Sequence, residues 1–271
     1  MSEMTGTFTT RDGLSLLTRT WTSESPRRGM LIVHGLGEHT GRWQHVARFF
    51  VERGYAVAAY DQRGHGESDG TRAYVGSFAE FVDDVQEIVE SGLVRTDLPW
   101  VLYGHSLGGL ISTHYLAEDR PHPDAAVLSA PALDAVLPTP LRVAARVLSK
   151  IAPKLALDNS ISGDQLSRDE AVGEAYFADP LVLTKATPRL AVETFGAQER
   201  SGEAIVNIET PTFVIHGADD PLVPPAGSAP LAAVPGIERK VYPGLRHEMH
   251  NEPEQAQLFG EVAAWLDSRL A

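Results

Sequence analysis

The chain has 271 residues, a length that suits one α/β core with an insertion and is sufficient to bury a sizeable core. Its formal net charge of −13 argues against a nucleic-acid partner or an anionic membrane bound by charge alone, and favours a neutral substrate. The absence of cysteine excludes disulfides, thiolate nucleophiles and cysteine-ligated metals. No signal peptide or bilayer-spanning apolar run is evident, so we expect a cytoplasmic protein.

The first half of the chain predicts a hairpin followed by alternating strands and helices. Residues 7–22 alternate around Asp12-Gly13, a dipeptide typical of a tight turn between antiparallel strands. Short apolar runs predict buried parallel strands at residues 30–33, 55–60, 100–103 and 125–129. Helical spacing and capping signals predict helices at residues 43–53, 77–94 and 110–117. This alternation favours a doubly wound, mostly parallel sheet with helices on both faces.

The alternation stops after Pro131. Helical segments without convincing strands follow at residues 141–150, 169–177 and 188–199, and strands resume at residues 212–215 and 239–242, before an amphipathic helix at 253–270. We therefore divide the chain into a first core part at residues 1–132, a helical cap insertion at 133–208 and a second core part at 209–271. An insertion of this kind is expected over the carboxyl ends of the strands, where such sheets bind ligands.

The sequence around Ser106 predicts a nucleophile. An apolar strand at residues 100–103 runs into the G-x-S-x-G pattern of residues 104–108, and a helical segment follows. Between a strand and a helix, this pattern holds one serine in a strained turn with its hydroxyl clear of the backbone. Ser68 lies in the same pattern at residues 66–70, but no apolar strand precedes it and no helix follows. We assign the nucleophile to Ser106, the alternative being a glycine-rich packing turn.

A nucleophilic serine needs a general base, and the base needs an acidic partner that orients it. In a fold with this strand, turn and helix, the partners follow in the order serine, acid, histidine, each after a later strand. The strand at residues 212–215 leads to Asp219 and Asp220, and the strand at 239–242 leads to His247. We prefer Asp220 as the acid because it lies further past the strand end, and keep Asp219 as the alternative.

Two backbone N–H groups are expected to bind the negative charge that forms on an ester carbonyl oxygen. Leu107, directly after the nucleophile, supplies one, and Leu36, in the loop after the first parallel strand, is the best candidate for the other. His247 and His250 flank Glu248 at a spacing of i+3, whereas a zinc-binding helix needs i+4, and no phosphate-binding glycine pattern occurs. The sequence therefore predicts neither a metal nor a cofactor.

Several motifs resemble those of the α/β-hydrolases, and more narrowly the monoacylglycerol lipase branch of the serine aminopeptidase S33 type. They are His34-Gly35-Leu36-Gly37-Glu38-His39-Thr40-Gly41-Arg42, Asp61-Gln62-Arg63-Gly64-His65-Gly66-Glu67-Ser68, residues 104–109, Ser129-Ala130-Pro131 and His247-Glu248-Met249-His250. The resemblance implies an α/β-hydrolase fold and a carboxylic ester hydrolase that cleaves monoacylglycerols to fatty acid and glycerol through an acyl-enzyme.

The same resemblance implies that Glu38, Arg42 and His250 line a polar pocket for the glycerol head group. The alternative is a local Glu38–Arg42 ion pair at i, i+4, with His250 satisfied in a turn. The same triad would also serve a lysophospholipase or a general carboxylesterase, and the fold could serve as a non-catalytic ligand-binding protein. The cap sequence matches no motif, so the preferred acyl chain stays open, and no oligomeric state follows from the sequence.

One cap segment has a pattern that can be interpreted without any family. Arg142, Arg146 and Lys150 recur at i+4 steps beside an apolar stripe, which consists of Ala144, Val147, Leu148 and Ile151. A basic face next to an apolar face predicts peripheral contact with a membrane or micelle surface. The alternative is a cap helix that packs on the core and leaves its basic residues in water.

Overall fold

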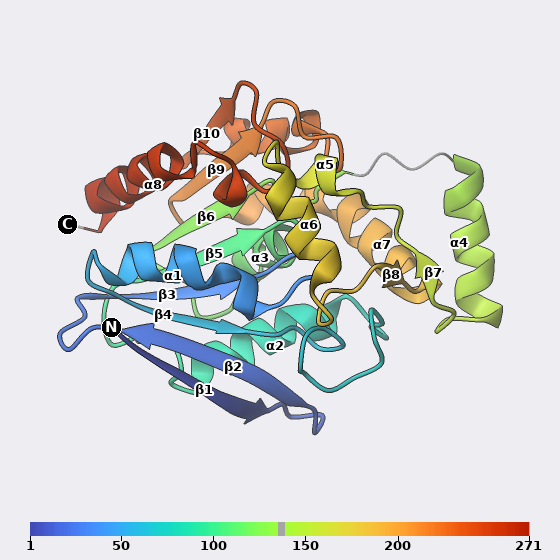
Figure 1. The fold of residues 1–271 in the computed structure, drawn as a ribbon, viewed down its shortest axis with the longest axis horizontal. Coiled ribbons are helices and arrows are strands. Elements are labelled where there is room, and N and C mark those ends of the chain that lie inside the picture. The colour runs from blue at the N-terminus through green and yellow to red at the C-terminus, as the bar shows by residue number, and fades with distance from the viewer. Residues whose placement is uncertain (135–138, 271) are drawn as a thin grey trace.

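The computed structural model describes residues 1–134 and 139–270, and its centre is a twisted sheet (Figure 1). The strands are β1 (Ser2–Thr9), β2 (Ser15–Thr22), β3 (Arg28–Val33), β4 (Tyr55–Tyr60), β5 (Trp100–His105), β6 (Ala125–Ser129), β9 (Thr212–Gly217) and β10 (Ile237–Tyr242). Within the described ranges these eight strands form one sheet in the order β1-β2-β4-β3-β5-β6-β9-β10.

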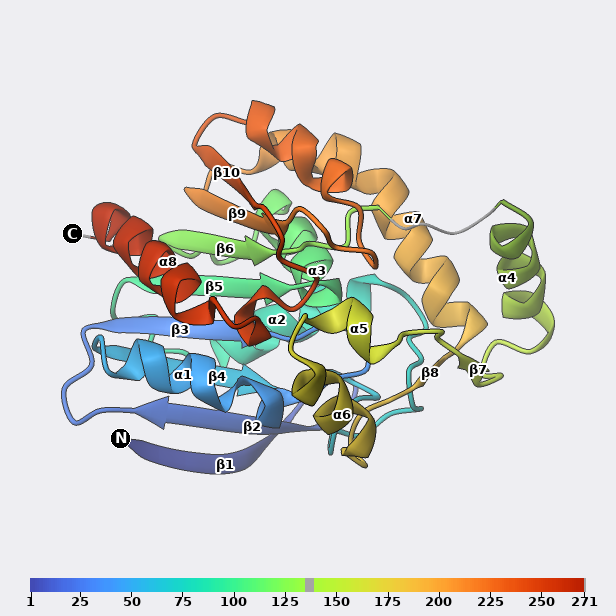
Figure 2. The same ribbon diagram turned by 45° about the horizontal axis from the view of Figure 1, so that its top comes forward.

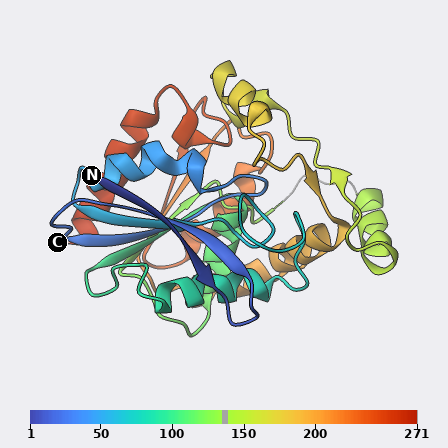
Figure 3. The same ribbon diagram turned by 60° about the horizontal axis from the view of Figure 1, so that its bottom comes forward.

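The hairpin of β1 and β2 is antiparallel and joins β4 antiparallel, whereas the other neighbouring strands pair in parallel. The predicted hairpin and the predicted mostly parallel sheet are therefore confirmed. Strands β4 and β6 have the predicted bounds, because each is a short apolar run that is buried along most of its length. In Figure 3 the strands fan out across one another, as expected from the twist of such a sheet.

Helices cover both faces of the sheet (Figure 2). They are α1 (Gln44–Val51), α2 (Ala79–Glu90), α3 (Leu107–Ala117) and α8 (Gln255–Arg269). Side chains of α1 and α8 form one buried apolar cluster with the sheet, and those of α2 and α3 form another. Helix α2 ends four residues before the expected position 94, because Gly92 takes a φ of +80° that terminates the helix.

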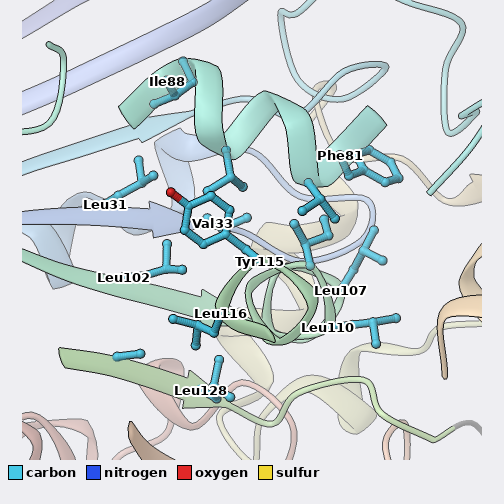
Figure 4. Packing of buried hydrophobic residues seen from close by; sticks show 14 of the residues in the cluster. Leu31, Val33, Phe81, Ile88, Leu102, Leu107, Leu110, Tyr115, Leu116 and Leu128 are labelled. Atoms are coloured by element: carbon cyan, nitrogen blue, oxygen red, sulfur yellow. The ribbon is translucent and has the colours of Figure 1, made fainter. Parts of the chain in front are cut away.

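The core lies on both sides of the sheet because successive strand side chains point to opposite faces. In β3, Leu31 and Val33 face α2 and α3, while Met30 and Ile32 face α1 and α8. Figure 4 shows the first of these layers, with strand residues Leu31, Val33, Leu102 and Leu128 and helix residues Phe81, Ile88, Leu107, Leu110, Tyr115 and Leu116. Since Leu107 belongs to this layer, packing of α3 fixes the position of the turn that precedes it.

A helical segment interrupts the series between β6 and β9. It contains α4 (Thr139–Ile151), α5 (Gly163–Leu166), α6 (Glu170–Ala178) and α7 (Pro188–Ala204), with two short antiparallel strands, β7 (Leu157–Asp158) and β8 (Lys185–Ala186). In Figure 2, α4, α5 and α6 lie beyond the carboxyl ends of the central strands. The sequence did not predict β7, β8 or α5, because elements of two to four residues carry no measurable periodicity.

The division of the chain into a first core part, a cap and a second core part remains a prediction. Residues 135–138 of the predicted cap and Ala271 of the second core part lie outside the described residues. Among the residues that the structure describes, no helix is both long enough and apolar enough to cross a membrane.

Candidate active site

Ser106 lies at the sharp turn between β5 and α3. Its backbone has a φ of 53° and a ψ of −117°, a region that residues other than glycine rarely adopt. A Cβ atom at Gly104 would lie 2.4 Å from the Ser112 hydroxyl, and one at Gly108 would lie 2.1 Å from the Val33 carbonyl oxygen. Both flanking glycines are therefore required by close contacts, which the sequence pattern alone could only imply.

The structure brings Ser106, His247 and Asp220 into one hydrogen-bonded chain. The Ser106 Oγ is 2.9 Å from the His247 Nε2, and the His247 Nδ1 is 2.7 Å from the Asp220 Oδ2. His247 is in the loop after β10 and Asp220 is in the loop after β9, as predicted. Asp219, the alternative acid, is exposed, whereas Asp220 is buried.

Asp220 is held by donors on both carboxylate oxygens. Its Oδ1 accepts hydrogen bonds from the backbone N–H groups of Leu222 and Val223, each at 2.9 Å. Its Oδ2 is 3.3 Å from the His216 Nε2, in addition to its contact with His247. This set of donors leaves Asp220 one orientation, with Oδ2 directed at the His247 ring.

The pKa values of His247 and Asp220 are shifted in opposite directions, which favours a basic imidazole beside an ionised carboxylate. Burial by itself lowers the pKa of His247, but the Asp220 carboxylate outweighs burial, so the pKa lies above its ordinary value. Burial by itself raises the pKa of Asp220, but the charge of His247 and the surrounding hydrogen bonds hold that pKa well below its usual range. An imidazole in this setting can take a proton from Ser106 and be stabilised as the cation.

Ser68, which occupies the second G-x-S-x-G pattern, is a structural residue. It is buried, its Oγ accepts a hydrogen bond from the Leu17 N–H at 2.8 Å, and its hydroxyl donates to the Asp61 carbonyl. Because both partners are backbone groups, Ser68 ties the loop after β4 to β2. Unlike Ser106, Ser68 is not directly between a strand and a helix, as the sequence predicted.

The two residues predicted to bind the oxyanion lie at the cavity beside Ser106. Both Leu36 and Leu107 line this cavity. Leu107 is the first residue of α3, and neither its backbone N–H nor that of Leu36 donates to an acceptor among the described residues. Both N–H groups are therefore available to a ligand, and their role as an oxyanion hole stays a prediction.

Glu38 and Arg42 form a buried charge cluster with Glu248. The Arg42 guanidinium donates two hydrogen bonds to Glu248, at 2.7 and 2.8 Å, and one to Glu38, at 3.2 Å. Glu38 also accepts hydrogen bonds from the Gly35 N–H at 2.6 Å and the Trp43 Nε1 at 3.0 Å. The predicted alternative of a Glu38–Arg42 ion pair at i, i+4 is thus part of the structure, although Arg42 contacts Glu248 more closely.

Sharing one guanidinium between two buried carboxylates separates their pKa values. Burial raises the pKa of Glu38, and the nearby Glu248 charge adds to that rise against the effect of Arg42. Burial also acts to raise the pKa of Glu248, but the paired hydrogen bonds and charge of Arg42 lower it below its ordinary value. The pKa of Glu38 therefore lies above its ordinary value and that of Glu248 below it, because Arg42 donates two hydrogen bonds to Glu248 and one to Glu38.

His250 lies behind the site rather than on its surface. It is fully buried, and its ring stacks on Trp43 with 4.2 Å between the centroids. Neither ring nitrogen has a hydrogen-bond partner among the described residues, and burial holds the pKa of His250 well below its ordinary value. Glu38 lines the cavity, whereas Arg42 and His250 are not among the lining residues. The head-group role of these three residues stays a prediction.

A cavity of about 770 Å³ opens above Ser106. Its floor includes Ser106, His247 and Glu38, and its walls come largely from the segment between β6 and β9. The apolar wall residues of that segment include Leu141, Ala144, Leu148, Leu157, Ile161, Leu166, Leu190 and Phe195. The cavity thus places Ser106 between a charged end and a long apolar wall.

The described residues hold no group of three or more His, Cys, Asp or Glu side chains arranged to bind a metal ion. The residues that flank Ser106 are instead arranged for acid–base chemistry and hydrogen bonding. This arrangement can activate a hydroxyl and receive a carbonyl compound with an apolar tail.

Residues 24–254 match the serine aminopeptidase S33 family. The chain belongs to this family. It is 38% identical over 269 residues to a monoacylglycerol lipase of Mycolicibacterium smegmatis, covering 95% of each chain. It is 31% identical over 261 residues to the phospholipase YtpA of Bacillus subtilis, covering 93% of this chain and 99% of that protein.

A solved structure has the same fold. The crystal structure of the Paleococcus ferrophilus monoacylglycerol lipase superposes with a TM-score of 0.85 and 29% sequence identity, covering 94% of this chain and 99% of that one. The α/β-hydrolase fold expected from the sequence is therefore confirmed. The predicted membership of the S33 type is confirmed as well.

Two residues at the site were missed by reasoning from the sequence. Glu248 lies in a motif shared with the α/β-hydrolases but was given no role from the sequence, yet it binds Arg42 and lines the cavity. Tyr176, in α6, is buried beneath the Arg42 guanidinium, which lies 4.7 Å from its ring centroid. Glu248 directly follows His247, and this position could have indicated a role at the site. No local sequence pattern indicates a role for Tyr176.

Proposed function

We propose that this protein hydrolyses monoacylglycerols to a free fatty acid and glycerol through an acyl-enzyme. The observation that carries the proposal is the hydrogen-bonded chain from Ser106 through His247 to Asp220 at the floor of a cavity with an apolar wall. The similarity to monoacylglycerol lipases over nearly the whole chain supports the choice of substrate. No cofactor enters the proposed reaction.

In this mechanism the Ser106 Oγ attacks the ester carbonyl carbon while His247 takes the hydroxyl proton. The carbonyl oxygen becomes an oxyanion, which the Leu36 and Leu107 N–H groups bind. His247 then returns the proton to the glycerol oxygen, which leaves, and the acyl group stays on Ser106. A water molecule, deprotonated by His247, attacks the acyl carbonyl carbon. The bond to the Ser106 Oγ breaks, His247 returns the proton to that oxygen, and the fatty acid leaves. Asp220 holds the imidazole in the required tautomer and stabilises its charge throughout.

The glycerol head group is proposed to occupy the charged end of the cavity. Glu38 lies in the loop after β3, two residues after Leu36, and lines the cavity. A glycerol hydroxyl in the cavity can therefore reach its carboxyl group. Arg42 and His250 support this end from behind, Arg42 through its hydrogen bond to Glu38 and His250 through stacking on Trp43, which itself donates to Glu38. The acyl chain is proposed to lie along the apolar wall of the predicted cap, residues 133–208.

The test is a substrate comparison with purified protein. Monoolein, lysophosphatidylcholine and nitrophenyl butyrate are assayed side by side, and the proposal expects the highest kcat/KM with monoolein. Preference for lysophosphatidylcholine would instead favour a phospholipase, a function that similarity to YtpA supports. Comparable rates on all three would indicate a general carboxylesterase. No turnover and no labelling of Ser106 by a fluorophosphonate would indicate a ligand-binding protein.

We also propose that α4 contacts the lipid surface from which substrate enters. Val143, Val147 and Ile151 are exposed on α4, with 51, 54 and 73% of their surface accessible. Of the basic residues, Arg146 pairs with Glu199 of α7 at 3.1 Å, and the Arg142 guanidinium lies 5.1 Å from the Phe195 ring centroid, while Lys150 is exposed. The contact is therefore proposed to be mainly apolar, with Lys150 at its edge.

A further inference from the structure

Glu252 is a buried carboxylate that the proposed mechanism does not use. Its side chain has no exposed surface, and it lies five residues after His247 in the same loop. It does not line the cavity. A buried carboxylate is costly unless donors compensate for its lost hydration, so its contacts reveal what it holds in place.

Each oxygen of Glu252 binds a different part of the protein. Its Oε1 accepts a hydrogen bond from the backbone N–H of Arg246 at 2.8 Å, and Arg246 immediately precedes His247. Its Oε2 accepts from the backbone N–H and the Nε of Arg168, at 3.2 and 3.1 Å. Arg168 belongs to the turn between α5 and α6, so one carboxylate connects the histidine loop to the predicted cap.

The backbone on the other side of His247 is held by the same turn. The N–H of Glu248 donates to the carbonyl of Leu166 at 2.8 Å. The Nη1 of Arg246 donates to the Ser167 carbonyl at 3.1 Å. The peptide N–H groups of both neighbours of His247 are therefore fixed, one by Glu252 and one by the turn at residues 166–168.

We propose that Glu252 is a positioning residue, which fixes the backbone of His247 to the turn at residues 166–168 and so makes this part of the cap a support of the triad. The proposal rests on the proposed function, since it assumes that His247 is the base. Reacting groups must be held closely, because a misplacement of about 1 Å can cost about a hundredfold in rate. A loosened histidine loop should lower kcat. KM should change little, because most of the cavity wall, apart from Leu166, comes from residues outside this turn.

The matched variants are Glu252→Gln and Glu254→Gln. Glu254 also pairs with Arg168 but is half-exposed, and among the described residues its side chain makes no hydrogen bond to the histidine loop. For nitrophenyl butyrate we expect Glu252→Gln to lower kcat about tenfold, with KM within about twofold, and Glu252→Ala to lower kcat further. The rate of fluorophosphonate labelling of Ser106 should fall with kcat. Glu254→Gln should keep both rates.

A folded Glu252→Gln variant with unchanged kcat would overturn the proposal. The proposal would also be overturned if the fall in kcat were fully explained by a smaller fraction of folded protein, measured by circular dichroism. If Glu252→Gln does not fold, Arg168→Met replaces it as the test. Arg168→Met removes the Arg168 Nε hydrogen bond to Glu252 but keeps the one from the Arg246 N–H, so we expect kcat to fall by only about threefold. A kcat equal to that of the parent protein would then overturn the proposal. Failure of the parent protein to hydrolyse monoolein would overturn the proposed substrate, while the nitrophenyl butyrate comparison would still test Glu252.

Discussion

The Ser106 backbone is strained, and its neighbours offset that strain. A non-glycine residue in such a conformation costs on the order of 1–3 kcal/mol. The Ser106 N–H donates to the Ser129 carbonyl at 3.0 Å, and the Ser106 carbonyl accepts from Ala132 and Leu110, both at 3.0 Å. The partners lie in β6, just after β6 and in α3, so the turn is fixed from both sides. The Ser106 hydroxyl therefore stays directed at His247.

Replacement of Ser106 by alanine tests the nucleophile. We expect Ser106→Ala to reduce kcat on monoolein by about four orders of magnitude or more, because no other hydroxyl reaches the His247 Nε2 in the described site. The melting temperature should stay close to that of the parent, since the hydroxyl makes no contact that the fold needs. Substantial residual turnover in a carefully purified sample would contradict the assignment.

The pH dependence of kcat/KM tests His247 as the base. A base must be neutral in the free enzyme, so activity rises with pH through the pKa of His247. Because Asp220 raises that pKa, the acid limb should have its midpoint above the ordinary histidine value of about 6.5. The buried neighbour His105, with a pKa near 3, stays neutral across this range.

The variant Asp220→Asn provides the control for that profile. It removes the carboxylate that raises the pKa of His247 and favours the wrong imidazole tautomer, so kcat should fall by about four orders of magnitude. Any residual activity should have its acid limb at lower pH than that of the parent. An acid limb that does not move would show that another group controls it.

At the scale of elements, the junction of β5, α3 and β3 depends on Gly108. A Cβ at Gly108 would lie 2.1 Å from the Val33 carbonyl oxygen, which is backbone and cannot move aside cheaply. We expect Gly108→Ala to destabilise the protein by more than about 2 kcal/mol in urea unfolding. As a matched control, Gly202→Ala in α7 meets nothing within 4 Å and should stabilise the protein by about 0.5–1 kcal/mol. Equal effects of the two variants would contradict this account.

Helix α4 offers a second test at the element scale. The double variant Val147→Ser, Ile151→Ser removes two of its exposed apolar side chains, neither of which lines the cavity. We expect weaker binding to phosphatidylcholine vesicles by flotation, with turnover of nitrophenyl butyrate unchanged, because only the proposed surface contact is lost. Replacing Arg142, Arg146 and Lys150 by glutamine should have the smaller effect. Unchanged vesicle binding by the serine variant would contradict the proposed contact.

At the scale of the whole molecule, the net charge of −13 sets the preferred lipid surface. An acidic protein is repelled by an anionic bilayer over roughly a Debye length, about 10 Å at 0.1 M salt. We therefore expect tighter binding to zwitterionic than to phosphatidylglycerol vesicles, with the difference shrinking as salt is raised. A preference for anionic vesicles at low salt would indicate that a local basic patch dominates instead.

The order of elements and the location of the candidate triad followed from the sequence. Strand runs such as 125–129 are apolar along their whole length, and turns such as Asp12-Gly13 have local chemistry, so both leave a signal within a few residues. Ser106, Asp220 and His247 were located by their places after successive strands, because the carboxyl ends of parallel strands meet at one edge of the sheet.

Only the tertiary structure decided what surrounds these residues. Arg42 and Glu248 are 206 positions apart in the chain, and Glu252 contacts a turn 84 positions before it. The direction of Arg146 toward Glu199 likewise depends on how α4 packs against α7. Such contacts leave no periodic or local pattern, because they arise from the packing of elements that the sequence specifies separately. The sequence by itself therefore determined the fold and the order of the reactive groups, and tertiary packing decided their support and the charged end of the cavity.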